Sequence, residues 1–213
     1  YKELFTEPYH PDEMKIYPTS VIEGTELYDL YKEGKHKPYD EKALIRVVGE
    51  CIASTPRYCR LSRVIRDIPS TEIAAGNKKT NLREVVEKYL RKKGIESEDI
   101  RSREIKGEEI SKDDIKLEKI TYKSTVGTDI FISYKTKKSD KICGFLRLFL
   151  PKKVLSRKHR LEELQNTSII REVHVYGKVV GIDRESKQGE SQHLGLGKEL
   201  VKIAEDISKK KGF

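Results

Sequence analysis

The spacing of apolar residues changes once along this chain, a little past its middle, and this change limits the folds open to it. Before it, apolar side chains recur three and four positions apart, as in the segment 40–56, which is the period of a helix. After it come three runs with strand character, 117–124, 129–136 and 141–150, and residues 137–140 supply a turn between the last two. Such a change of period predicts two domains, the second built around an antiparallel sheet.

The part before the change reads as helices alternating with short strands. Asp40 is a good N-cap for a helix that ends before Pro56, and two other helices are predicted at 25–34 and 81–94. An alternating run at 58–64 suits a half-buried strand. This α/β rhythm is typical of the late units of a barrel or of an open parallel sheet.

A charged stretch at 95–116, poor in large apolar residues, is predicted to be a linker between a domain at 1–94 and a domain at 117–213. In the second domain a fourth strand is expected at 168–175. A loop follows, and then a helix from near His193 to Lys211. This order of elements resembles the first two-thirds of an acetyltransferase sheet.

The composition favours an anionic partner. Lysine and arginine outnumber the acids by 44 to 35, which gives a formal net charge of +9 and an isoelectric point near 9.2. This excess suits RNA, a phosphate-bearing cofactor or a membrane surface, although lysine-rich faces are often only solubilising. No apolar run approaches the roughly 20 residues that span a bilayer.

Cys51, Cys59 and Cys143 are odd in number and widely spaced. They predict neither a disulfide framework nor a paired metal motif, and they fit a reducing cytoplasm. The chain begins at Tyr1 with neither an initiator Met nor a signal-peptide pattern, so we interpret position 1 as an internal point of a longer protein.

The most informative segment opens the last predicted helix, with the sequence Gln192-His193-Leu194-Gly195-Leu196-Gly197-Lys198. Glycines there let backbone N–H groups approach a diphosphate without a Cβ in the way, and the positive end of the helix dipole favours the anion. The Gln-x-x-Gly-x-Gly form resembles the acyl-CoA phosphate loop of the GNAT superfamily, whereas a Rossmann loop spaces its glycines differently. The alternative interpretation is a glycine-containing helix start with no ligand.

The resemblance to GNAT proteins also implies a role for the strand before this loop. Its free backbone groups would pair with the pantetheine arm, so the strand would act mainly through its main chain. His174 is also a candidate base, although a lone strand histidine is more often structural. The candidate cofactor-binding residues of strand and loop are Glu172, Val173, His174, Val175, Gln192, Gly195, Leu196, Gly197 and Lys198.

Four motifs appear in the order and with the spacing found in the catalytic subunit of Elongator. They are Ile-Tyr-Pro-Thr at 16–19, Arg-Asp-Ile-Pro at 66–69, Arg-Ser-Arg-Glu at 101–104 and Arg-Glu-Val-His-Val-Tyr-Gly at 171–177, followed by Gln192-His193. The chain resembles this family over essentially its whole length. The resemblance implies the end of a radical S-adenosylmethionine α/β barrel, followed by a truncated GNAT fold. It also implies acetyl-CoA-dependent, carboxymethyl-type modification of carbon 5 of the wobble uridine in tRNA.

The same resemblance implies acetyl-CoA as the cofactor of this chain, and S-adenosylmethionine with a 4Fe–4S cluster for the longer protein. The cluster-binding cysteines of the family are absent from this chain. Ser102 stands where some relatives carry a zinc-binding cysteine, so we expect no metal site. The family's chain continues into a further strand and helix with a tyrosine that contacts coenzyme A. This fragment alone is therefore expected to be inactive.

Basic residues of the first domain are candidate RNA contacts, because arginine forks bind phosphate bidentately and lysines contribute point charge. For the four arginines, Arg57, Arg60, Arg63 and Arg66, domain docking is the alternative role. Arg66 and Asp67 are alternatively an internal ion pair. Lys15 is placed near the active cavity by the resemblance alone. The candidates are Lys15, Arg57, Arg60, Arg63, Arg66, Lys78 and Lys79.

Two other functions stay open at this point. A GNAT enzyme that acetylates protein lysines would use the same phosphate loop, but it needs a general base, and no carboxylate stands out for that role. A non-catalytic RNA-binding scaffold is the third hypothesis, and the intact glycines at 195 and 197 argue against it. The expected partners are tRNA and acetyl-CoA, with a homodimer or accessory Elongator-type subunits as alternative assemblies and no membrane.

Overall fold

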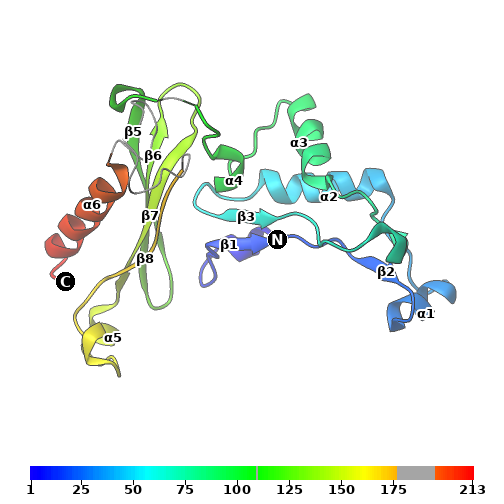
Figure 1. Cartoon of the computed structure of the whole chain (residues 1–213). Coiled ribbons are helices and arrows are strands. Elements are labelled where there is room, and N and C mark those ends of the chain that lie inside the picture. The colour runs from blue at the N-terminus through cyan, green and yellow to red at the C-terminus, as the bar shows by residue number, and fades with distance from the viewer. Residues whose placement is uncertain (109, 177–194) are drawn as a thin grey trace, which may run out of the picture. The chain divides into compact units, whose positions relative to one another are not determined.

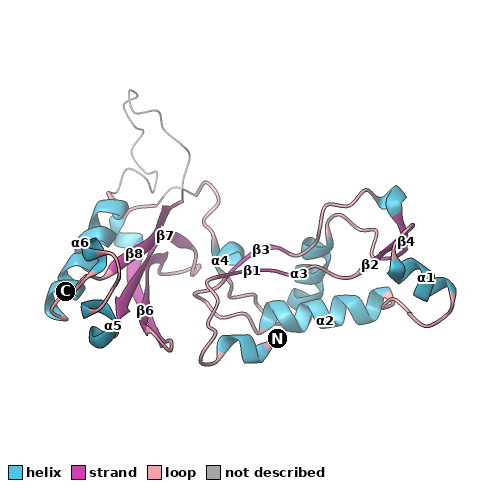
Figure 2. Cartoon of the chain, turned by 90° about the horizontal axis from the view of Figure 1, so that it is seen from below, coloured by secondary structure: helices cyan, strands magenta, loops and turns pink. Residues whose placement is uncertain are grey.

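The computed structural model describes residues 1–108, 110–176 and 195–213. They form two compact units, one of Tyr1–Phe5 with Pro11–Ser102 and one of Thr6–His10 with Arg103–Phe213 (Figure 1). Helices and strands occur in both units, so the chain has an α/β fold, as predicted (Figure 2). Within the described ranges, every helix is too short or too polar to cross a membrane.

The first two predicted helices are confirmed, together with their caps. α1 (Glu26–Lys32) begins after Thr25, whose hydroxyl accepts a hydrogen bond from a first-turn amide. α2 (Glu41–Ala53) begins after Asp40, whose carboxylate accepts a 2.7 Å hydrogen bond from the N–H of Ala43. Short polar side chains at these positions therefore fix both helix starts.

The third predicted helix is α3 (Leu82–Lys92), which begins after Asn81 without a side-chain cap. It packs against α2 across the core of the first unit. Since apolar residues recur on one face of each helix, the two faces meet and exclude water. The buried residues of this core are Leu44, Val48, Ile52, Leu61, Val64, Leu82, Val86 and Leu90.

The strands of the first unit are short and form two separate pairs. β1 (Glu13–Lys15) pairs in parallel with β3 (Arg60–Arg63), and β2 (Ser20–Ile22) pairs antiparallel with β4 (Ile73–Gly76). The run predicted at 58–64 is therefore a strand, but the expected parallel sheet is limited here to one pair. The 3-10 helices within the described ranges of both units are η1 (Lys2–Phe5), η2 (Ser70–Glu72), η3 (Lys112–Asp114) and η4 (Glu162–Leu164).

The segment 95–116, predicted to be a linker, contains ordered and buried structure. It includes α4 (Ile100–Arg103), in which Ile100 is fully buried. Asp99 is fully buried as well, and it accepts a 2.8 Å hydrogen bond from the guanidinium of Arg83 in α3. The hydroxyl of Ser102 donates to the same carboxylate at 2.5 Å. These contacts join the start of the segment to the first unit, while the domain boundaries stay a prediction.

The second unit is built on a four-stranded sheet in the order β5-β6-β7-β8. The strands are β5 (Ile115–Lys123), β6 (Gly127–Thr136), β7 (Ile142–Pro151) and β8 (Ile169–Val175), and each neighbouring pair is antiparallel. Asp140, with φ at 56°, lies in the predicted turn between β6 and β7. All four predicted strands are therefore confirmed, as is the antiparallel arrangement predicted for the first three.

Helix α6 (Leu196–Lys210) packs on one face of this sheet, against β6, β7 and β8. The predicted helix start near His193 lies outside the described residues. A shorter helix, α5 (Lys153–Arg157), follows β7. The buried residues between α6 and the sheet are Ile130, Ile132, Leu146, Leu148, Leu150, Leu200 and Ala204.

Candidate functional site

The first turn of α6 begins with a glycine that cannot cap it. Gly195 is the N-cap residue and adopts a left-handed conformation with φ at 69°. It has no side chain to accept a hydrogen bond from the first-turn amides, whereas Thr25 and Asp40 do so for α1 and α2. A Cβ at position 195 would meet no heavy atom of the described residues within 4 Å. Uncapped amides at the positive end of a 15-residue helix can bind an anion.

The helix start lies beside the carboxyl end of β8. A Cβ built on Gly197 would come 3.6 Å from Cγ2 of Val175. Leu196 is fully buried and anchors the first turn on the sheet. The structure therefore brings together two candidate segments that the sequence predicted, the glycines of the loop and the end of the strand. Gln192 and His193 lie outside the described residues.

In the described part of the chain, β8 pairs with β7 alone and is the edge of the sheet. The N–H of Tyr176, just beyond β8, donates a 2.9 Å hydrogen bond to the carbonyl of Cys143. Main-chain groups of an antiparallel strand alternate in direction, so those of Val175 and Val173 point away from β7. This leaves main-chain donors and acceptors at the sheet edge, next to the start of α6.

The side chains of Glu172 and His174 lie on the sheet face opposite α6, where each contacts another side chain. Glu172 accepts a 2.8 Å hydrogen bond from Arg147, whose side chain is 3% exposed. The guanidinium of Arg147 also lies 5.4 Å from the ring centre of Phe145, a cation–π contact. The His174 ring lies 4.4 Å from the Tyr176 ring, between centroids. This packing agrees with the structural interpretation of His174.

A β-bulge interrupts β8 at Arg171. Register partners step from Glu172 to Ile170 on β8 while β7 advances by one residue, so Arg171 is the extra residue. Its guanidinium donates a 2.6 Å hydrogen bond to Asp129, which is buried. Bulges of this kind bend a strand and re-aim its neighbours. The bulge was not evident from the sequence.

A second group that the sequence did not reveal holds the first turn of α6 on the sheet. The carboxylate of Glu199 accepts a 3.0 Å hydrogen bond from the Tyr134 hydroxyl and a 2.7 Å hydrogen bond from the Lys112 ammonium. The bond from Lys112 is the main cause that lowers the pKa of Glu199. Burial, together with the bond to Glu199, raises the pKa of Tyr134. Lys112 and Tyr134 are far from Glu199 in the sequence, so no local pattern marks them.

The structure divides the candidate RNA-binding residues of the first unit into groups. Lys15 and Arg63 are register partners on β1 and β3. Arg66, Lys78 and Lys79 line one small cavity of about 30 Å³. The fold therefore gathers two sets of candidates, Lys15 with Arg63 and Arg66 with the two lysines.

Several of these basic residues have acidic partners. Arg57 pairs with Glu98 at 3.1 Å, and Lys79 pairs with Glu41 at 2.5 Å. Asp67, considered as a partner for Arg66, instead binds Arg63 at 2.9 Å. The ion pair predicted as an alternative for Arg66 is therefore wrong.

Cysteines offer no metal site in the part of the chain that the structure describes. None of the three forms a disulfide, and no cluster of three or more His, Cys, Asp or Glu side chains in the described ranges has the geometry to hold a metal ion. Cys143 is fully buried, and burial raises the pKa of its thiol to about 11. A thiol with that pKa is protonated at neutral pH and is a poor metal ligand.

Comparison with known proteins identifies relatives of both units. The family model of the radical SAM C-terminal domain matches residues 11–92. A tRNA uridine(34) acetyltransferase of Methanocaldococcus infernus is 42% identical over 98% of this chain and 40% of its own length. Elongator complex protein 3 of Saccharomyces cerevisiae is 37% identical over 98% of this chain and 38% of its own length.

A solved structure agrees with these sequence relatives. The structure of Methanocaldococcus infernus Elp3 with an N-terminal deletion superposes with a TM-score of 0.83 at 40% identity. The match covers 99% of this chain and 50% of the other. The chain therefore spans about two-fifths of the length of the curated relatives it matches, and half of the solved one.

Proposed function

Since this chain belongs to the family of Elongator complex protein 3 and the tRNA uridine(34) acetyltransferases, matching a carboxy-terminal portion of it, we propose that it supplies the acetyl-CoA-binding part of a tRNA-modifying enzyme. The reaction of that enzyme is a carboxymethyl-type modification at carbon 5 of the wobble uridine. Residues 1–94 are the end of the radical SAM barrel domain, and residues 117–213 belong to a GNAT domain.

One observation carries this proposal: among the described residues, the start of α6 has no side-chain cap and lies beside β8, the edge strand of the sheet. The N–H groups at Gly195, Leu196, Gly197 and Lys198 would hold the diphosphate of coenzyme A. The outward main-chain groups of β8 would pair with the amides of the pantetheine arm, as an added strand pairs with a sheet edge. The cofactor supplies the acetyl group, and this chain binds and orients it.

The iron–sulfur cluster does not fit this chain. Cys59 and Cys143 are fully buried, and the cysteines do not cluster with one another in the described ranges. A cluster needs several thiolates gathered at one place. The radical chemistry of the enzyme therefore depends on residues outside this chain, and we assign none of its steps to the residues present.

The tRNA would contact the basic residues of the first unit. Lys15 with Arg63, and Arg66 with Lys78, are the pairs that the fold gathers. These contacts are with phosphate groups and therefore do not depend on base sequence. Binding should weaken steeply with salt, because each phosphate contact releases counterions.

The decisive experiment supplies the intact protein with tRNA, acetyl-CoA and S-adenosylmethionine under anaerobic conditions. Mass spectrometry of the digested tRNA should then show a heavier wobble uridine only when all three are present. A parallel reaction with a lysine-containing peptide tests the alternative acetyltransferase function. Efficient peptide acetylation together with an unmodified uridine would overturn the proposal.

A further inference from the structure

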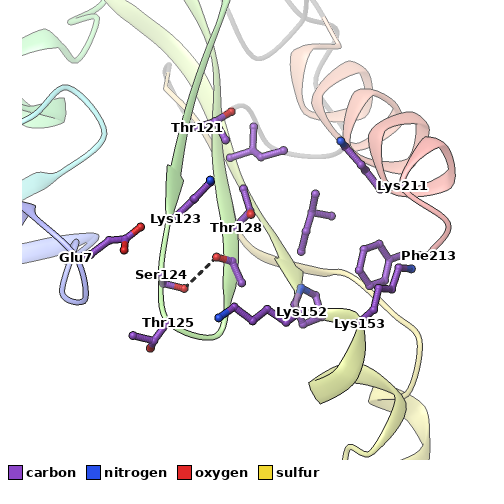
Figure 3. Close-up of a pocket in the computed structure, with 14 residues that line it drawn as sticks. Glu7, Thr121, Lys123, Ser124, Thr125, Thr128, Lys152, Lys153, Lys211 and Phe213 are labelled. Atoms are coloured by element: carbon purple, nitrogen blue, oxygen red, sulfur yellow. Dashed lines mark hydrogen bonds between the residues drawn. The ribbon is translucent and has the colours of Figure 1, made fainter.

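The second unit contains a basic cavity that the proposed coenzyme site does not use. Its volume is about 920 Å³, and it lies between the β5–β6 hairpin, the end of β7 and the end of α6 (Figure 3). Lys123 ends β5, Lys152 follows β7, and Lys211 follows α6, so three separate elements each place a lysine on its wall. Among the described residues that line it, Glu7 is the only acid.

The amines of Lys123, Lys152 and Lys211 have no carboxylate partner within the described ranges. A lysine that only solubilises a surface is usually dispersed or paired with an acid. Three unpaired amines around one concave surface repel one another and focus a positive potential on it. An anion in the cavity would relieve this repulsion.

This cavity is distinct from the start of α6. Gly195 and Lys211 lie at opposite ends of a 15-residue helix, which is roughly 22 Å long. The negative end of the helix dipole favours a cation at Lys211 by itself, but it does not explain Lys123 or Lys152, which come from other elements. If coenzyme A binds at the start of α6 through its diphosphate, those phosphate groups lie at the opposite end of the helix from Lys211.

We propose that this cavity binds phosphate groups of the RNA backbone. It would add a tRNA contact in the second unit to those proposed for the first unit. The inference rests on the proposed tRNA-modifying function. Thr121 and Ser124 add hydroxyl groups to the lysines on the cavity wall. The ring of Phe213, which could otherwise stack on a base, is covered by the Lys153 ammonium 3.4 Å from its centroid. The wall thus presents amines and hydroxyls for phosphates, and no free ring for a base.

The test compares two triple variants of the intact protein that lose the same charge. The cavity variant carries Lys123→Gln, Lys152→Gln and Lys211→Gln. The control carries Lys116→Gln, Lys138→Gln and Lys202→Gln, which remove exposed lysines that do not line the cavity. Each is titrated with an unmodified tRNA transcript at several salt concentrations, and each is also titrated with acetyl-CoA.

The cavity variant should bind tRNA at least about tenfold more weakly at moderate salt, and its log–log salt slope should be shallower by about two. Its acetyl-CoA affinity should equal that of the wild type, which also shows that it is folded. The control should keep most of the tRNA affinity. A third variant, in which the three cavity lysines are replaced by arginine, should bind tRNA about as well as the wild type.

Equal losses in the two triple variants, or an unchanged salt slope in the cavity variant, would overturn this inference alone. Titration with inorganic phosphate, in the absence of acetyl-CoA, distinguishes RNA phosphate groups from free phosphate as the ligand of the cavity. Inorganic phosphate that binds the wild type and not the cavity variant, while tRNA affinity is the same in both, would make the cavity a site for free phosphate and overturn the inference. If the wild-type protein binds no tRNA at all, the proposed function fails with it.

Discussion

The hydroxyl of Tyr134 in β6 donates a 3.0 Å hydrogen bond to the carboxylate of Glu199 in the first turn of α6. Lys112 donates to the other oxygen of the same carboxylate at 2.7 Å. The two bonds tie the start of α6 to the sheet and to the segment before β5. The amides proposed to bind the diphosphate are thus held at a fixed place relative to the sheet.

Removal of the Tyr134 hydroxyl should therefore weaken the second unit. Tyr134→Phe leaves the Glu199 carboxylate with one fewer donor, and we expect the free energy of unfolding to fall by about 1 kcal/mol. Tyr39→Phe is a suitable control, because Tyr39 is 69% exposed. Chemical denaturation measures both variants. Equal stability of the two would show that the Tyr134 bond contributes nothing.

The same carboxylate predicts a pH dependence. Lys112 lowers the pKa of Glu199, so the charged form is favoured in the folded state. A lowered folded pKa gives stability that is present above the unfolded pKa and is lost as the pH falls through the folded pKa. The melting-temperature advantage of the wild type over Glu199→Gln should therefore shrink between about pH 7 and about pH 3. An advantage that grows on acidification would contradict this assignment.

The pair of Arg147 and Glu172 allows a test of main-chain binding by β8. Glu172→Ala removes a carboxylate partner of a guanidinium that is 3% exposed, and we expect a loss of about 2–3 kcal/mol in unfolding free energy. Glu205→Ala, on the exposed face of α6, is the control. Below its melting temperature the Glu172 variant should bind acetyl-CoA as the wild type does, since the strand is proposed to act through its backbone. A selective loss of coenzyme binding would assign the role to the side chain instead.

Sequence reasoning predicted the features whose signals are local. The cap at Asp40, the turn before Lys141 and the strand runs of the second unit each depend on neighbouring residues, and the structure confirms them. β2 and β4, which have three and four residues, give too short a pattern to recognise. Their pairing depends on contacts between distant segments.

The candidate site was predictable in part, for the same reason. Gly195 and Gly197 mark the helix start in the sequence, but the position of Val175 beside Gly197 follows from the packing of α6 on the sheet. The basic cavity combines lysines from three elements, none of which is unusual in its own segment.

The most direct test of the central claim is the affinity of the intact protein for acetyl-CoA when position 195 carries Asn or Asp. Both residues tolerate the left-handed conformation of Gly195, and they are nearly equal in size. An added negative charge at the helix start should repel the diphosphate, although it favours the helix itself. Isothermal titration calorimetry should show that Gly195→Asp binds at least about tenfold more weakly than Gly195→Asn, without a lower melting temperature. Equal affinities for the two variants, or no uptake of acetyl-CoA by the wild type, would contradict the claim that the amides of α6 hold coenzyme A.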